Sequence, residues 1–126
     1  MPIVTIERYP HVTVITIPLP NQHYRRLLAP AIDPPEWAKI LYMLVERYGR
    51  KILTYPVPAL ELVVERYEVP ETVADILYKI AEMRNWFTEK TGIDADKAAE
   101  TSLDKLRTAV EEAYELYLAF KAAGAF

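Results

Sequence analysis

The two histidines of the chain, His11 and His23, are its most direct candidates for acid–base chemistry. One imidazole could take a proton from a phosphodiester substrate while the other returns one. The guanidinium groups of Arg25 and Arg26 follow His23 closely and could stabilise the charge of the transition state. The same histidines, with Glu7, could instead bind a metal ion if a hairpin folded back onto the next loop. Both histidines also suit an ordinary turn and loop, so we expect neither a catalytic pair nor a metal site.

The segment at 21–26, "NQHYRR", is the most polar stretch and the candidate nucleic-acid contact. Arg25 and Arg26 suit phosphate recognition, and the ring of Tyr24 could stack on a nucleobase. A solvated loop, or a loop that docks a partner subunit, explains the same residues. The carboxyl-terminal half is acidic and the net charge of the chain is -3, so nucleic-acid binding is not the favoured function. The other basic residues that could take part are Arg47, Arg50 and Lys51.

The composition argues against several other kinds of chemistry. There is no cysteine, which excludes disulfides, thiolate catalysis and cysteine-based zinc sites. The three glycines are too far apart to form a phosphate-binding loop. Ser102 is the only serine and has no histidine near it in the sequence. No apolar run approaches the roughly 20 residues that span a bilayer. We therefore expect no enzyme activity, no cofactor and no membrane segment.

The amino-terminal residues predict a β-hairpin followed by a loop. Residues 3–8 ("IVTIER") and 12–17 ("VTVITI") are rich in β-branched side chains, and a short connection separates them. The next stretch, 18–30, begins and ends with proline, which favours a loop over a regular element.

A helix is expected over 34–48. Asp33 and Glu36 have the spacing of a capping box, and Gly49 is well placed to end the helix. Residues 51–56 ("KILTYP") then predict a short strand.

The tripeptide Glu-Arg-Tyr occurs three times, at 7–9, 46–48 and 65–67. In a strand, its Glu and Tyr share one face, whereas in a helix the three side chains fan out by about 100° each. One tripeptide cannot present the same constellation from both backbones, so we interpret the repeat as structural. Residues 58–68 fit both a helix and a strand by their apolar pattern. The match between "LYMLVERY" and "LELVVERY" favours a helix there.

The segment 70–124 predicts an antiparallel helical hairpin and carries the strongest structural signal in the chain. Apolar residues recur at steps of three and four in two stripes. Gly92 can end the first helix, and Asp94 can cap the next. The first stripe is Val73, Ile76, Ile80, Met83 and Phe87. The second stripe is Leu103, Leu106, Val110, Ala113, Tyr117 and Phe120.

Together these elements predict an α+β fold, with an amino-terminal β-hairpin and a small helical bundle that ends in an antiparallel helical hairpin. The 52% hydrophobic content supports a real core, and 126 residues suit a single domain. The expected parts are the β-hairpin at 1–20, a helix with a mixed connector at 33–69 and the helical hairpin at 70–124.

The aromatic stripe of the last helix is the candidate interface. Nine tyrosines and two tryptophans supply material for binding hot spots, and the apolar tail that ends at Phe126 could dock on a neighbour. We therefore predict a non-enzymatic structural or protein-interaction protein that self-associates as a dimer. The alternatives are a nucleic-acid-binding accessory or regulatory protein that uses Arg25 and Arg26, and a small phosphodiester hydrolase that uses His11 and His23. The predicted interface residues are Leu103, Leu106, Val110, Tyr117, Phe120 and Phe126.

The composition also indicates a hot habitat. The chain has one Gln, two Asn, no Cys, ten Pro and 26% charged residues, a balance typical of hyperthermophilic proteins. With this composition, its length, and "IERYPHVTVITIPLP" leading into helices, the chain resembles small open-reading-frame proteins of crenarchaeal viruses of the Pyrobaculum spherical virus type. The resemblance implies a viral protein in the host cytoplasm or associated with the virion. In that setting, a viral or host protein could be a partner besides the expected second copy of the chain.

Overall fold

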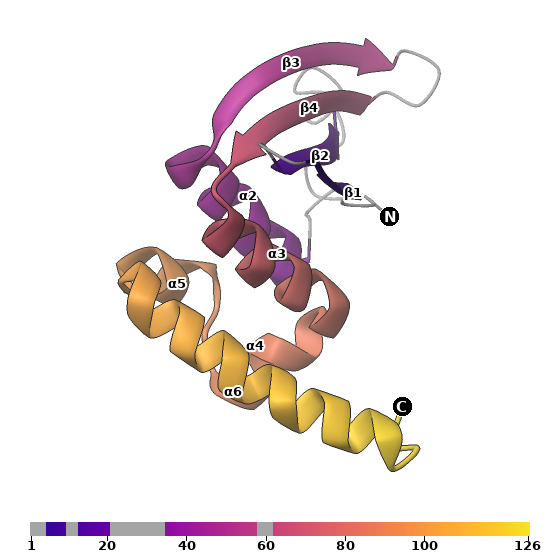
Figure 1. Cartoon of the computed structure of the whole chain (residues 1–126), viewed down its shortest axis with the longest axis vertical. Coiled ribbons are helices and arrows are strands. Elements are labelled where there is room, and N and C mark those ends of the chain that lie inside the picture. The colour runs from indigo at the N-terminus through magenta and orange to yellow at the C-terminus, as the bar shows by residue number, and fades with distance from the viewer. Residues whose placement is uncertain (1–4, 10–12, 21–34, 58–61) are drawn as a thin grey trace. The chain divides into compact units, whose positions relative to one another are not determined.

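The computed structural model describes residues 5–9, 13–20, 35–57 and 62–126, which form four strands and five helices (Figure 1). The predicted α+β class is therefore confirmed. The strands are β1 (Thr5–Arg8), β2 (Thr13–Pro20), β3 (Arg50–Val57) and β4 (Leu62–Val69). The helices are α2 (Glu36–Tyr48), α3 (Glu71–Met83), α4 (Asn85–Thr91), α5 (Ala95–Glu100) and α6 (Leu103–Ala122).

The four described strands form one antiparallel sheet in the order β1-β2-β4-β3. β1 pairs with β2, with Ile6 opposite Ile15, as the predicted amino-terminal hairpin requires. β4 lies between β2 and β3, so that Tyr67 is opposite both Ile15 and Lys51. The register of β3 shifts at Ile52, and such a bulge in an edge strand disturbs pairing with other chains.

Of residues 58–68, where the pattern fitted both elements and we favoured a helix, the described part belongs to strand β4 (Leu62–Val69). Side chains alternate along the strand, with Glu65 and Tyr67 buried and Arg66 partly exposed. The helix prediction was wrong because β4 pairs along both of its edges, with β2 and with β3. These pairings join segments that are distant in the sequence, and they outweigh local helix propensity. Residues 58–61 lie outside the described part of the chain.

Gly49 follows α2 as predicted, and the reason is steric. A Cβ atom at this position would lie 2.6 Å from the Val45 carbonyl oxygen and 3.0 Å from a Val69 methyl group. Only glycine fits that approach without a backbone shift. The predicted capping residue Asp33 lies outside the described residues, and the strand expected at 51–56 is confirmed as β3.

The predicted helix at 70–90 is divided at Arg84, which has a φ of 53°. Gly92, with a φ of 73°, ends α4 as expected. Asp94 caps α5, because its side chain accepts a backbone N–H at 2.8 Å. Ser102 then caps α6 in the same way. The predicted helical hairpin at 70–124 is therefore wrong as a pair of helices, since this segment forms four helices and α5 follows α4 before α6 begins.

The chain forms two compact units, and the single-domain organisation stays a prediction. The first unit contains the four strands with the last turn of α2 and the first turn of α3. The second, the helical unit, contains the rest of α2 and α3 with α4, α5 and α6. The buried apolar residues of the first unit are Val14, Ile15, Leu44, Val45, Tyr67, Val69, Val73 and Ala74. Those of the helical unit are Trp37, Ile40, Leu41, Ile76, Leu77, Ile80, Met83, Phe87, Ala98, Leu106, Val110 and Ala113.

Candidate functional site

The residues proposed for nucleic-acid contact and acid–base chemistry lie outside the described part of the chain. They are Tyr24, Arg25, Arg26, His11 and His23, and their roles stay predictions. Among the described residues, no group of three or more His, Cys, Asp or Glu could hold a metal ion. No helix in the described ranges is both long and apolar enough to cross a lipid bilayer.

The most unusual described surface is an aromatic cluster at the carboxyl-terminal end of α6. Trp86 of α4 lies at its centre, with ring centroids 5.6 Å from Tyr117, 6.1 Å from Phe120 and 6.0 Å from Phe126. All three are edge-to-face contacts, which aromatic rings favour. Tyr117 and Phe126 also stack, 5.1 Å apart. We call these four residues the aromatic end of the helical unit.

The end of α6 has the backbone geometry that returns Phe126 to this cluster. Gly124 has a φ of 79°, which glycine adopts without steric cost. Its N–H donates to the Lys121 carbonyl at 3.1 Å, and the Ala125 N–H donates to the Phe120 carbonyl at 2.9 Å. This pair of bonds is a Schellman motif, which reverses the chain after a helix. The final phenylalanine is therefore held against Tyr117 by an ordered cap.

The predicted interface stripe divides into a buried half and an exposed half. Leu106 and Val110 lie in the core of the helical unit. Beyond Ala113, no residue of α6 is buried. Phe120 is 41% exposed and Phe126 is 61% exposed. Leu103 and Tyr117 are partly exposed.

Trp86 was not among the predicted interface residues. It directly precedes Phe87 of the first apolar stripe, and in the helical unit Phe87 is fully buried. The one signal in the sequence was the pair of adjacent rings, of which only one can face the core of a helix.

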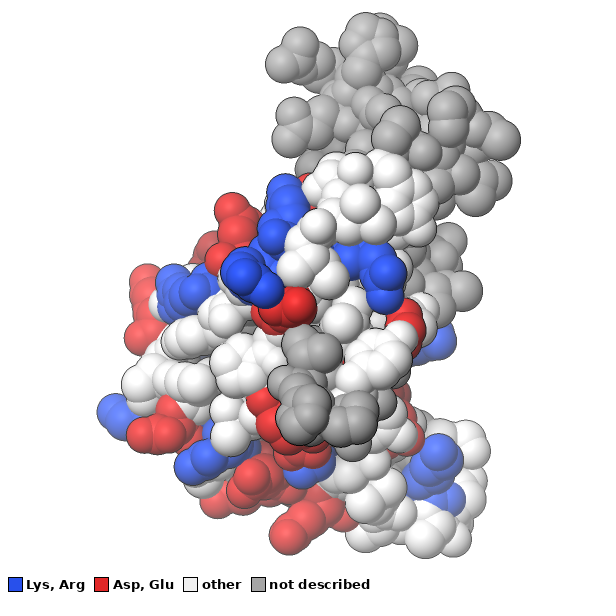
Figure 2. All heavy atoms as spheres, turned by 45° about the horizontal axis from the view of Figure 1, so that its top comes forward, with Lys and Arg blue, Asp and Glu red and all other residues white. Residues whose placement is uncertain are grey.

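Charge surrounds the aromatic end unevenly. Lys121 is the only charged residue between Leu116 and Phe126, and its Nζ lies 6.0 Å from the centre of the Tyr117 ring. Figure 2 shows largely uncharged surface at this end of α6 on the face that it displays. The exposed glutamates of α6, Glu111, Glu112 and Glu115, lie nearer to its middle, and Asp104 lies in its first turn.

Tyr114 lies beside the aromatic end and contacts both an aromatic ring and charged side chains. It stacks on Tyr117, with 6.2 Å between ring centroids, and the Nζ of Lys79 lies 5.4 Å from its own ring centre. The hydrogen bond to Glu82, together with burial and the charge of that carboxylate, raises the pKa of Tyr114 well above its usual value. Among the described residues, Glu82 Oε2 is buried without a hydrogen-bond partner.

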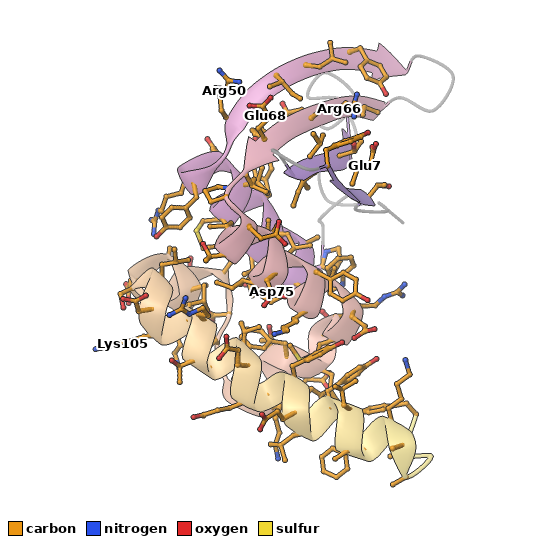
Figure 3. The ribbon with its side chains drawn as sticks, in the orientation of Figure 1. Glu7, Arg50, Arg66, Glu68, Asp75 and Lys105 are labelled. Atoms are coloured by element: carbon orange, nitrogen blue, oxygen red, sulfur yellow. The ribbon has the colours of Figure 1, made fainter. Side chains whose placement is uncertain are left out.

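One face of the sheet is charged and is formed by Glu7, Arg50, Arg66 and Glu68. These four side chains form ion pairs with one another. Arg66 pairs with Glu7 at 3.4 Å, and Arg50 pairs with Glu68. Figure 3 shows these two pairs on the sheet, each with its partners pointing toward one another. Lys51, which points to the other face, pairs with the buried Glu65 at 3.0 Å. Arg50 and Lys51 are therefore engaged by carboxylates, which weakens the case for them as phosphate ligands.

Both strand copies of Glu-Arg-Tyr make the same contact. The Tyr9 hydroxyl donates to Glu7, and the Tyr67 hydroxyl donates to Glu65. This matches the prediction that Glu and Tyr share one face of a strand. The helical copy at 46–48 has a different backbone, so the repeat supplies local structure and not three equal sites.

Comparisons with protein-family models, curated proteins and solved structures found no match, so the argument for a function rests on the surfaces described above.

Proposed function

We propose that this chain is a non-enzymatic protein-interaction protein that self-associates through the aromatic end of its helical unit. The carrying observation is that Phe120 and Phe126 stay 41% and 61% exposed although they pack around Trp86. Aromatic residues, phenylalanine included, are enriched at protein–protein interfaces. An ordered cluster of exposed rings is therefore better suited to a protein partner than to solvent.

The size of this surface indicates how much a partner must cover. The exposed parts of Phe120 and Phe126 amount to about one full ring, and burial of one large aromatic residue removes roughly 150–250 Å². At about 25 cal/mol per Å², this contributes roughly 4–6 kcal/mol. Association costs about 4–15 kcal/mol in lost freedom. A symmetric dimer buries these rings on both copies, roughly 8–12 kcal/mol in all, which only about balances this cost, so a stable dimer must bury the neighbouring apolar residues as well.

A second copy of the chain has the chemistry that this surface requires. Among the side chains from Leu116 to Phe126 only Lys121 is charged, so a partner must offer a largely apolar surface in return. Most soluble oligomers are symmetric homo-oligomers, in which one patch meets itself. Self-association satisfies both conditions without a further component.

Light scattering on a sizing column tests this proposal. We expect the mass to rise from the monomer value of 14.5 kDa towards twice that value as concentration increases. Phe120→Ala should raise the dimer dissociation constant about tenfold or more, as for a hot-spot residue. Leu53→Ala removes a side chain of similar exposure, 45%, from β3 and serves as the control. A wild-type chain that stays monomeric at every concentration would overturn the proposal.

A further inference from the structure

The carboxyl-terminal half of α6 exposes large apolar side chains on two opposite flanks. Leu116 and Leu118 are each 44% exposed. Residues two positions apart in a helix are separated by about 200° around its axis. The two leucines therefore cannot contact the same surface, and their surroundings decide which flank suits a partner.

The flank of Leu116 is continuous and uncharged. Leu116, Ala119, Phe120 and Ala123 follow the i, i+3, i+4, i+7 spacing of a single helix face. All four are exposed in the helical unit. We call them the Leu116 stripe. Phe120 also packs on Trp86, so the stripe is continuous with the aromatic end.

The flank of Leu118 is different because charges border it. Glu115 lies one turn before Leu118, and Lys121 lies one turn after it. Burying this flank would remove charged groups from water, which is costly unless each is paired. The Leu116 stripe is bordered by charge only at its amino-terminal end, where Glu112 lies one turn before Leu116 and Glu115 one turn before Ala119, so the rest of this flank can be covered at a lower cost.

The order of large and small residues in the stripe distinguishes antiparallel from parallel pairing. In an antiparallel pair with a two-fold axis between Ala119 and Phe120, each Leu116 faces Ala123 of the second copy. Each Phe120 then lies level with Ala119 of the second copy. Leu116 therefore meets a small side chain, which lets the helices approach closely, and the two Phe120 rings meet each other beside the axis, where aromatic rings can stack. Parallel pairing would instead place Leu116 against Leu116 and leave gaps between the alanines.

The charge of Glu112 also favours antiparallel over parallel pairing. Parallel pairing would bring Glu112 level with Glu112 of the second copy, and like charges that face each other oppose association. In the antiparallel pair, Glu112 lies beyond the carboxyl-terminal end of α6 of the second copy, which ends at Ala122, and stays in water. We infer that a second copy of the chain covers the Leu116 stripe in an antiparallel α6–α6 pair with this two-fold axis. The inference rests on the proposed function, because it specifies the geometry of the same self-association.

Two matched leucine variants test which flank is buried. Leu116→Arg and Leu118→Arg place the same charge at equally exposed positions of one helix. Leu116→Arg should raise the dimer dissociation constant about tenfold or more, and Leu118→Arg less than about threefold. Sedimentation equilibrium measures both constants, and circular dichroism confirms that both variants are folded. Equal effects of the two variants, or a larger effect of Leu118→Arg, would overturn the inference.

Engineered cysteines test the position of the two-fold axis. The chain has no cysteine of its own, so a disulfide can form only between the introduced cysteines of two copies. Ala119→Cys lies beside the axis and should form a disulfide-linked dimer under mild oxidation, whereas Leu118→Cys on the other flank should not. A wild-type dimer without the Ala119→Cys link would reject this geometry and leave the proposed function standing. A wild-type chain that remains monomeric would reject both.

Discussion

The charged face of the sheet and the aromatic end of the helical unit both reach solvent, yet their side chains are satisfied differently. On the sheet, Glu7 pairs with Arg66 and Arg50 pairs with Glu68. At the aromatic end, Phe120 and Phe126 pack on Trp86 and still leave much of their rings exposed. The sheet face has the polar partners that it needs. The aromatic end keeps much of its ring surface exposed, which is why we assign the interaction to it.

The largest expected loss of stability follows truncation of a buried phenylalanine, and truncation of an exposed one provides the contrast. Phe87 of α4 is fully buried, whereas Phe120 is 41% exposed. Phe87→Ala should lower the free energy of unfolding by about 3–5 kcal/mol, because it leaves a cavity in the core. Phe120→Ala should cost the monomer less than about 1 kcal/mol while weakening the dimer. Urea unfolding at a concentration where the chain is monomeric measures both. Similar losses would mean that Phe120 belongs to the core of the helical unit.

The Tyr–Glu hydrogen bonds of the two strand copies of Glu-Arg-Tyr should differ in how much they stabilise the fold, by less than the two phenylalanines do. Tyr67→Phe removes the hydroxyl that donates to Glu65, a residue only 8% exposed. We expect a loss of about 1–3 kcal/mol, because a buried carboxylate loses a hydrogen bond. Tyr9→Phe removes the equivalent bond to Glu7, where water can replace it. Its cost should therefore be much smaller than that of Tyr67→Phe. Equal costs in thermal unfolding would contradict the difference in burial between the two contacts.

The parts of the fold that were predicted correctly depend on local chemistry. Gly49, Gly92 and Asp94 end or begin helices as expected, because each has a conformational or hydrogen-bonding property that acts within a few residues. The apolar stripe of α3 and α4 is buried as predicted. These features needed no knowledge of distant segments.

The wrong predictions depend on contacts that the sequence pattern does not show. β4 resembles part of α2 in sequence, and only its pairing with β2 and β3 makes it a strand. The break at Arg84 has no local signal, because the spacing of Met83 and Phe87 continues across it. The same holds for the candidate site. Phe120 and Phe126 were predicted, but the role of Trp86 depends on the direction of α4 after that break.

A pH-dependent prediction concerns the border of the aromatic end. The pKa of Tyr114 is raised by its hydrogen bond to Glu82 and by burial, so the folded chain holds this proton more tightly than the unfolded chain. This contribution to stability is complete below the ordinary tyrosine pKa of about 10 and is lost as pH rises above it. Tyr114→Phe should therefore lose less stability than the wild type between about pH 9 and pH 11. Urea unfolding across this range measures the difference, and parallel curves would contradict it.

The smallest loss of stability is expected when an exposed ion pair on the sheet is removed. Arg50→Ala breaks an ion pair whose arginine side chain is 76% exposed, so it should cost at most about 1 kcal/mol. That cost should shrink further between about 0.1 and 1 M salt, because ions screen exposed charges. The weakening of the dimer by Phe120→Ala should persist over the same range, since it arises from apolar contact. A double-mutant cycle with Glu68→Ala isolates the energy of the pair. If salt weakened the dimer as strongly as it weakens this pair, charges would dominate the association, and the contrast between the two surfaces would fail.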